Sequence, residues 1–141
     1  MKKTFLMAGV LICGTLSLMA QDVKPKDVPA VVKASLAKKY PAATKVNWEK
    51  EKGNFEANWG GKSGEDNSAV FTPAGEFVEI VNAIPVSALP KAVAPYVKEH
   101  YKTPIKEAGK VTDAKGTLTY EAEIKGKDLI FDANGKFLKV D

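Results

Sequence analysis

One stretch, Val28 to Trp48, constrains the fold more than any other part of the chain. It reads VPAVVKASLAKKYPAATKVNW, with apolar residues at helical spacing, then a Tyr-Pro pair, then an alternating segment that ends in tryptophan. Because a residue that precedes proline avoids the α conformation, Pro41 ends this predicted helix. A weaker copy, LPKAVAPYVKEHYKTPIKEAGKV, starts at Leu89, 61 positions after Val28 (89 − 28). The sequence therefore predicts one helix-then-strand unit that is used twice.

Segments with period-two alternation follow each predicted helix, and turn signals separate them. Phe55, Ala57 and Trp59, for example, alternate with polar residues. We predict an α+β fold with two units, 28–84 and 85–141, each a helix followed by a four-stranded antiparallel meander. An apolar sheet face needs a cover, so the two meanders are expected to join into one larger antiparallel sheet with both helices on one face.

Three local features refine this prediction. Residues 21–27 are polar and are expected to form a flexible tail. Ser87 is a candidate N-cap for the second helix. Pro95 is expected to kink or split that helix, because proline removes a backbone hydrogen-bond donor.

Residues 1–20 have the pattern of a Sec signal peptide. Lys2 and Lys3 precede an apolar run over 5–18, and cleavage is predicted after Ala20. The run is too short for a good membrane anchor, and Cys13 follows Leu-Ile where a lipoprotein would have a small residue. We therefore expect a periplasmic or secreted protein with no membrane insertion after removal of the leader, because no later apolar run reaches spanning length.

Composition disfavours several function classes. All 21 basic residues are lysine, whereas bidentate recognition of phosphate and guanine favours arginine, so we expect no nucleic-acid partner. Removing Lys2 and Lys3 lowers the net charge of +4 by two. Cys13 lies in the leader and His100 is the only histidine. Thiol chemistry, histidine-based triads and zinc sites therefore lack the residues they need. We predict no catalytic residue, no metal, no cofactor and no enzyme activity.

The remaining candidates are polar residues on the sheet face opposite the helices. This face would be either a plain solvated surface or a docking surface for another protein. Trp48 and Trp59 share a face with aliphatic neighbours, which favours a core position, with Trp59 as an alternative aromatic anchor at the sheet margin. The candidate protein-binding residues are Asn47, Glu49, Glu56, Asn58, Lys62, Thr119, Glu121 and Glu123.

The segments VPAVVKASLAKKYPAATKVNW, FEANW and AVFTPAGEFVEI resemble the PepSY-like, β-lactamase-inhibitor-like proteins of Bacteroidetes envelopes. The likeness covers residues 28–140 in two copies, of which the first is the better match. The resemblance implies a tandem helix-plus-antiparallel-sheet fold and a periplasmic, non-enzymatic role.

Two function hypotheses follow from these observations. The first is a soluble periplasmic binding module, an inhibitor of an envelope enzyme for example, whose partner would contact the open polar sheet face and the loop over 60–67. The alternative is a small-ligand or envelope-stress carrier that holds its ligand between helices and sheet.

Overall fold

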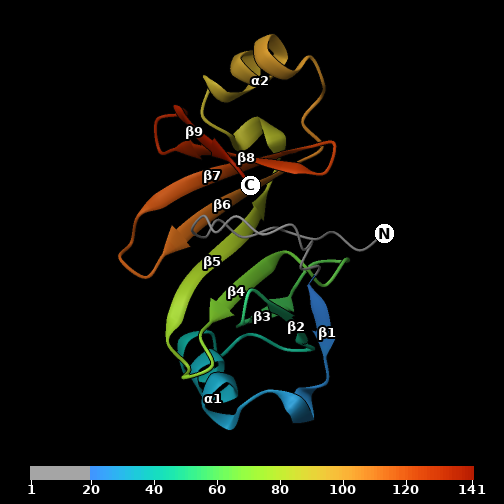
Figure 1. Cartoon of the computed structure of the whole chain (residues 1–141), viewed down its shortest axis with the longest axis vertical. Coiled ribbons are helices and arrows are strands. Elements are labelled where there is room, and N and C mark those ends of the chain that lie inside the picture. Colours follow the sequence, from blue (N-terminus) through green and yellow to red (C-terminus); the bar gives the residue numbers. More distant parts are fainter. Residues whose placement is uncertain (1–19) are drawn as a thin grey trace. The chain divides into compact units, whose positions relative to one another are not determined.

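The computed structural model describes residues 20–141, and it has an α+β fold (Figure 1). The described strands are hydrogen-bonded in sequence order, β1 to β9, in one antiparallel sheet, which confirms the predicted fold class. The predicted signal peptide, apart from Ala20, lies outside the described residues. In chain order the elements are β1 (Gln21–Val23), η1 (Pro25–Asp27), α1 (Ala30–Lys39), β2 (Asn47–Glu51), β3 (Asn54–Trp59), β4 (Asn67–Phe71), β5 (Phe77–Ile84), η2 (Val86–Ala88), α2 (Val93–Tyr101), β6 (Glu107–Asp113), β7 (Leu118–Ile124), β8 (Lys127–Asp132) and β9 (Phe137–Val140).

The chain divides into two compact units, and the boundary falls inside β5, between Val81 and Asn82. We call residues 20–81 the N-terminal unit and residues 82–141 the C-terminal unit. Each has its own hydrophobic core.

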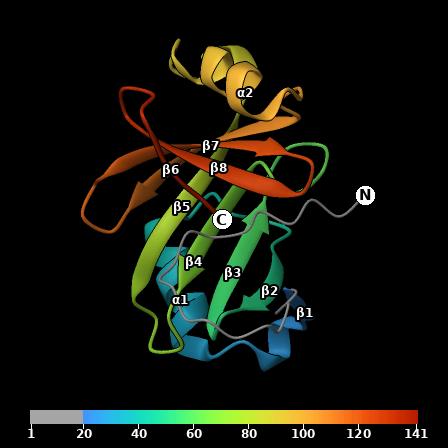
Figure 2. The ribbon, with the colours of Figure 1, turned by 45° about the horizontal axis from the view of Figure 1, so that its top comes forward.

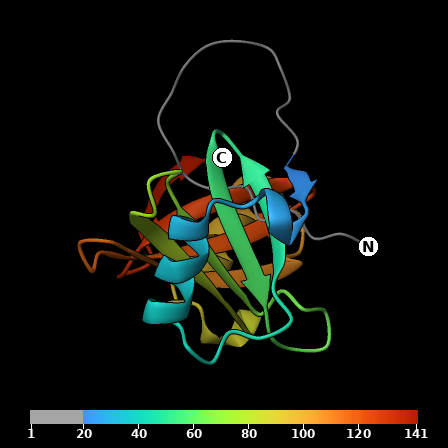
Figure 3. The same ribbon diagram turned by 90° about the horizontal axis from the view of Figure 1, so that it is seen from below.

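In the N-terminal unit, α1 ends where the sequence predicts. The Tyr40 N–H donates to the Leu36 carbonyl at 2.7 Å, and Pro41 follows. Val32 and Leu36 are buried and lie one turn apart on the same face of α1. This face packs on β2–β5, which lie side by side in Figures 2 and 3.

The sheet face beneath α1 carries alternate residues of each strand, as predicted. β2 pairs with β3 so that Trp48 lies opposite Ala57, and Phe55 of β3 lies opposite Phe71 of β4. All four side chains belong to the core, and Trp48 is 6% exposed. The core interpretation of the tryptophans is therefore correct.

The first residues of the N-terminal unit differ from the prediction. Gln21–Val23 forms β1, which pairs antiparallel with β2, and Pro25–Asp27 forms a turn of 3-10 helix. The flexible-tail prediction for 21–27 is wrong, because backbone hydrogen bonds to β2 hold this polar segment and need no apolar side chain.

In the C-terminal unit, α2 starts later than predicted. Ser87 lies inside η2, and the N-cap residue of α2 is Ala92, so the N-cap prediction is wrong. Pro95 falls in the first turn of α2, where backbone N–H groups make no hydrogen bond within the helix, so the missing N–H of proline costs no such bond. It therefore neither kinks nor splits the helix. Val93 and Val97 face the core formed with Leu129 and Phe131.

Each unit also brings a glycine-containing turn against its helix. Gly75, with φ of 83°, accepts a hydrogen bond from the Ser35 hydroxyl at 2.7 Å. A Cβ on Gly75 would lie 2.8 Å from Ser35 Oγ and 2.9 Å from a Val31 methyl group. Gly135 approaches Pro90 and Ala92 in the same way. These turns fix each helix against its own strands.

Candidate functional site

Polar side chains occupy the face of β2 and β3 opposite α1. Glu49 lies directly opposite Glu56, and Asn47 lies directly opposite Asn58. The Ser68 hydroxyl of β4 donates a hydrogen bond to Asn58 Oδ1. The structure therefore brings together the four strand residues that the sequence predicts for this part of the site.

The exposure of this face contradicts the prediction of an open, solvated surface. Glu56 is 4% exposed, Asn58 is 5% exposed and, in the C-terminal unit, Glu121 is 1% exposed. Asn47 and Lys62 are exposed, whereas Glu49, Thr119 and Glu123 are half-buried. Alternation on a strand identifies which residues share a face, but it does not say whether that face meets water.

Burial strongly perturbs Glu56. The pKa of Glu56 is raised from 4.5 to about 8, mainly by loss of solvent and to a smaller extent by repulsion from Glu49 and Glu51. A hydrogen bond from Asn58 opposes this shift. The carboxyl group of Glu56 is therefore largely protonated at neutral pH and can donate a hydrogen bond.

Two further acidic residues on this face are absent from the sequence-based candidates. Glu51 is 3% exposed, and neither of its carboxylate oxygens has a hydrogen-bond partner among the described residues. Burial raises its pKa, and Lys52 opposes the shift. Glu79 of β5 is 6% exposed and contributes to the raised pKa of Glu56. The period-two pattern could have found both, since Glu51 follows Glu49 by two positions and Glu79 precedes the core residue Ile80.

This acidic cluster does not form a metal site. Within residues 20–141, no group of three or more His, Cys, Asp and Glu side chains has the arrangement to hold a metal ion. His100 lies in the C-terminal unit with its ring centroid 4.1 Å from that of Tyr96. Clustered perturbed carboxyl groups occur at functional sites, but structural networks also contain them.

The connection between β3 and β4, residues 60–66, is internally hydrogen-bonded; residues 61–63 and Asp66 are exposed, and the others are half-buried. The Asp66 N–H donates to the Gly60 carbonyl at 3.2 Å, and the Glu65 N–H donates to Ser63 Oγ at 3.2 Å. Gly61 has φ of 68°, and a Cβ there would overlap the Asp66 carboxylate. We call residues 60–66 the β3–β4 loop. It projects beyond the ends of these strands (green in Figure 3).

The C-terminal unit joins the corresponding strands, β7 and β8, through only Lys125 and Gly126. The β3–β4 loop therefore has no counterpart of similar length between β7 and β8. Asn47 lies next to this loop, because a Cβ on Gly64 would be 3.6 Å from Asn47 Nδ2. Asn47 and the β3–β4 loop, which carries Lys62, therefore contribute to one polar surface, which we call the loop surface (residues 47 and 60–66).

Trp59 precedes this loop but is not an interface anchor. It is 8% exposed and its ring centroid lies 5.4 Å from that of Tyr40. The Asn67 amide donates to the Trp59 carbonyl at 3.2 Å, so the residue fixes the base of the loop instead. The aromatic-anchor alternative is wrong because the Trp59 ring belongs to the core.

Comparisons with known proteins identify the family. A family model described as "Putative beta-lactamase-inhibitor-like, PepSY-like" matches residues 16–60 and 62–139. The chain belongs to this family. The comparison with curated proteins gave no match. Among the described residues, no helix combines the length and apolar character that crossing a membrane requires.

Solved structures with the same fold come from Bacteroides species. A protein from Bacteroides eggerthii described as putative periplasmic has a TM-score of 0.64 at 20% identity, covering 81% of this chain and 88% of that one. A DUF2874 family protein from Bacteroides uniformis has a TM-score of 0.64 at 20% identity, covering 80% and 88%. A BLIP-like protein from Bacteroides fragilis has a TM-score of 0.57 at 20% identity, covering 80% and 84%. At this identity the likeness shows the fold.

Proposed function

We propose that this PepSY-like protein is a non-enzymatic binding module of the periplasm, and that it contacts an envelope protein through the loop surface. The observation that carries the proposal is the β3–β4 loop, which is exposed at residues 61–63 and Asp66, braced by its own hydrogen bonds and replaced by a two-residue turn in the C-terminal unit. A braced loop loses little conformational entropy on binding, which favours its use as a contact surface.

The chemistry of the loop surface suits a polar interface. It presents the Lys62 ammonium group and the Asn47 amide to solvent, together with exposed backbone at Gly61. Protein interfaces of this kind carry about one hydrogen bond per 100–200 Å². The periplasmic description of the Bacteroides eggerthii structure and the family's inhibitor-like name support an envelope partner, such as an enzyme that the module inhibits.

Site-specific photo-crosslinking in cells tests this proposal. A benzophenone amino acid at position 62 should crosslink a discrete partner, whereas the same group at position 125, in the short β7–β8 turn, should not. Lys62→Glu combined with Asn47→Ala should reduce partner capture by about tenfold or more, since interface contacts contribute about 1 kcal/mol or more each when central. Identical crosslinks from both positions, or no crosslink from position 62, would reject the loop surface.

A further inference from the structure

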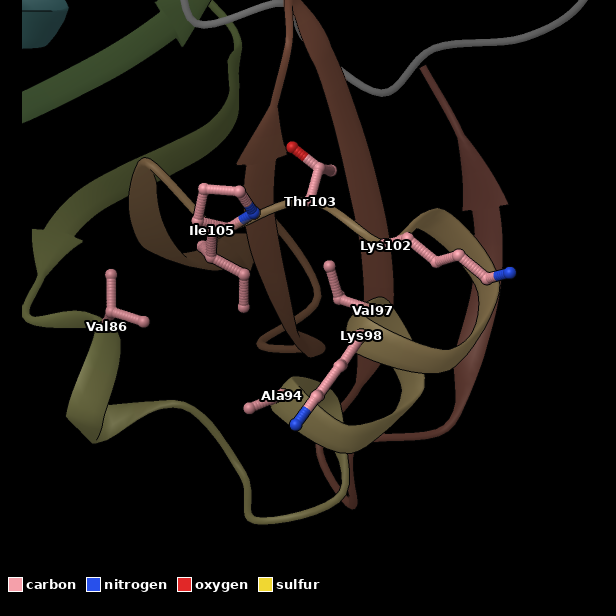
Figure 4. A pocket seen from close by; sticks show the side chains of 8 residues that line it. Val86, Ala94, Val97, Lys98, Lys102, Thr103 and Ile105 are labelled. Atoms are coloured by element: carbon pink, nitrogen blue, oxygen red, sulfur yellow. The ribbon is translucent and has the colours of Figure 1, made fainter.

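A pocket of about 550 Å³ lies beside α2, entirely within the C-terminal unit (Figure 4). Val86 of η2, Ala94 and Val97 of α2, and Ile105 after the helix form its apolar wall. Figure 4 shows the side chains of Val86, Ala94 and Ile105 directed toward a common space. The volume falls within the range of small-molecule sites, about 300–1,000 Å³.

Small side chains on α2 open this pocket. Positions 94, 97 and 98 share one face of the helix because they are three and four residues apart. At the positions 61 residues earlier on α1 (94 − 33 and 97 − 36), the larger Lys33 and Leu36 replace Ala94 and Val97. The pocket is therefore a feature of the sequence of α2.

The charge around the pocket is positive. The exposed side chain of Lys98 lies beside Ala94, and Lys102 lies at the other end of the lining, with its side chain directed away (Figure 4). No carboxylate and no aromatic ring belongs to the lining residues in the described chain. The C-terminal end of a helix contributes about half a negative charge, so the two lysines leave the rim positive.

We propose that this pocket binds a small aliphatic carboxylate, such as a medium-chain fatty acid. The alkyl chain lies against Val86, Ala94 and Ile105, and the carboxylate lies at the Lys98 ammonium group. A neutral apolar ligand would leave that charge unused, and an aromatic ligand would find no ring to stack on. This site is independent of the loop surface, because it uses residues of the other unit.

The test is a titration of the isotope-labelled full mature chain with hexanoate, octanoate and decanoate at neutral pH, followed by NMR. Amide shifts should concentrate at Ala94, Val97, Thr103 and Ile105. Affinity should rise roughly two- to fourfold per added methylene group, as expected for burial of alkyl surface. Octanol, which has an octanoate-length chain without the charge, should bind about threefold to tenfold more weakly.

Two variants, each with a matched control, test separately the contribution of the apolar pocket wall and that of the Lys98 charge to octanoate binding. Ala94→Leu fills the pocket and should reduce octanoate affinity by about tenfold or more, whereas Ala37→Leu, also at an exposed helical alanine, should not change it. Lys98→Glu should weaken octanoate and strengthen octylammonium, while Lys33→Glu on α1 should change neither. Unchanged thermal midpoints would establish that the variants are folded.

Shifts scattered over both units, equal affinity for octanol and octanoate, or octanoate binding that survives Ala94→Leu would overturn the proposal.

Discussion

Replacing Glu56 with glutamine should stabilise the protein at alkaline pH and remove much of the pH dependence of the N-terminal unit. The carboxyl group is 4% exposed, and its pKa is raised from 4.5 to about 8 by burial and by repulsion from Glu49, Glu51 and Glu79. Glutamine has nearly the same shape as the protonated acid but cannot ionise, so it keeps the neutral form at every pH.

The sign of the effect follows from proton linkage. Between pH 4.5 and about 8 the folded protein holds a proton on Glu56 that the unfolded chain has released, so the free energy of unfolding falls as pH rises. The full stability contribution is present below the unfolded pKa and is lost as pH passes through the folded pKa. At about 1.4 kcal/mol per pKa unit, the loss approaches about 5 kcal/mol by pH 9.

Denaturant unfolding followed by tryptophan fluorescence measures this difference, since Trp48 and Trp59 both belong to the core of the N-terminal unit. Glu56→Gln should match the wild type at pH 4.5 and exceed its unfolding free energy by several kcal/mol at pH 9. The exposed Glu76 provides the control, because Glu76→Gln should leave the pH profile unchanged. If Glu56→Gln changed the free energy of unfolding equally at all pH values, the conclusion that Glu56 is protonated in the folded protein would be refuted.

Two further predictions concern packing and buried polar contacts. Gly75→Ala should destabilise the protein by about 2–4 kcal/mol, because the new Cβ would contact Ser35 and Val31 and the residue has positive φ. Gly53→Ala is the control, since Gly53 also has positive φ but has open space around it, and it should cost about 1 kcal/mol. Chemical denaturation compares the two variants, and equal losses of unfolding free energy would contradict the close approach of Gly75 to α1. Ser68→Ala should lower the free energy of unfolding by about 1–3 kcal/mol, because it leaves the buried Asn58 Oδ1 without this hydrogen-bond donor. Adding Asn58→Leu to this variant should recover part of the lost stability. Additive losses in the double-mutant cycle would argue against a hydrogen bond between Ser68 and Asn58.

The sequence predicted those features that local chemistry decides. Proline at position 41 and helical spacing from Val28 were enough to find α1, and alternation was enough to find the core side of β3. The length of the β3–β4 loop was visible because its glycines and polar residues interrupt two apolar strands.

The errors arise where distant backbone or burial decides the outcome. β1 is held by pairing with β2, and its side chains carry no strand signal. Glu56 and Asn58 look like surface residues, since carboxylates and amides usually meet water, and only the structure shows them buried. The start of α2 was placed too early, at Ser87, which put Pro95 inside the predicted helix. The structure starts α2 at Val93, so Pro95 falls in the first turn, where proline is tolerated.

A variant with a shortened loop shows whether residues 60–66 are the contact surface for the partner. Residues 60–66 would be replaced by Lys-Gly, the sequence that joins β7 to β8 at Lys125 and Gly126. Affinity for the protein crosslinked at position 62 would be measured by calorimetry, with circular dichroism and thermal unfolding as checks of the fold. We expect a folded variant that no longer binds the partner. A folded variant that binds the partner with unchanged affinity would show that the β3–β4 loop is not the contact surface.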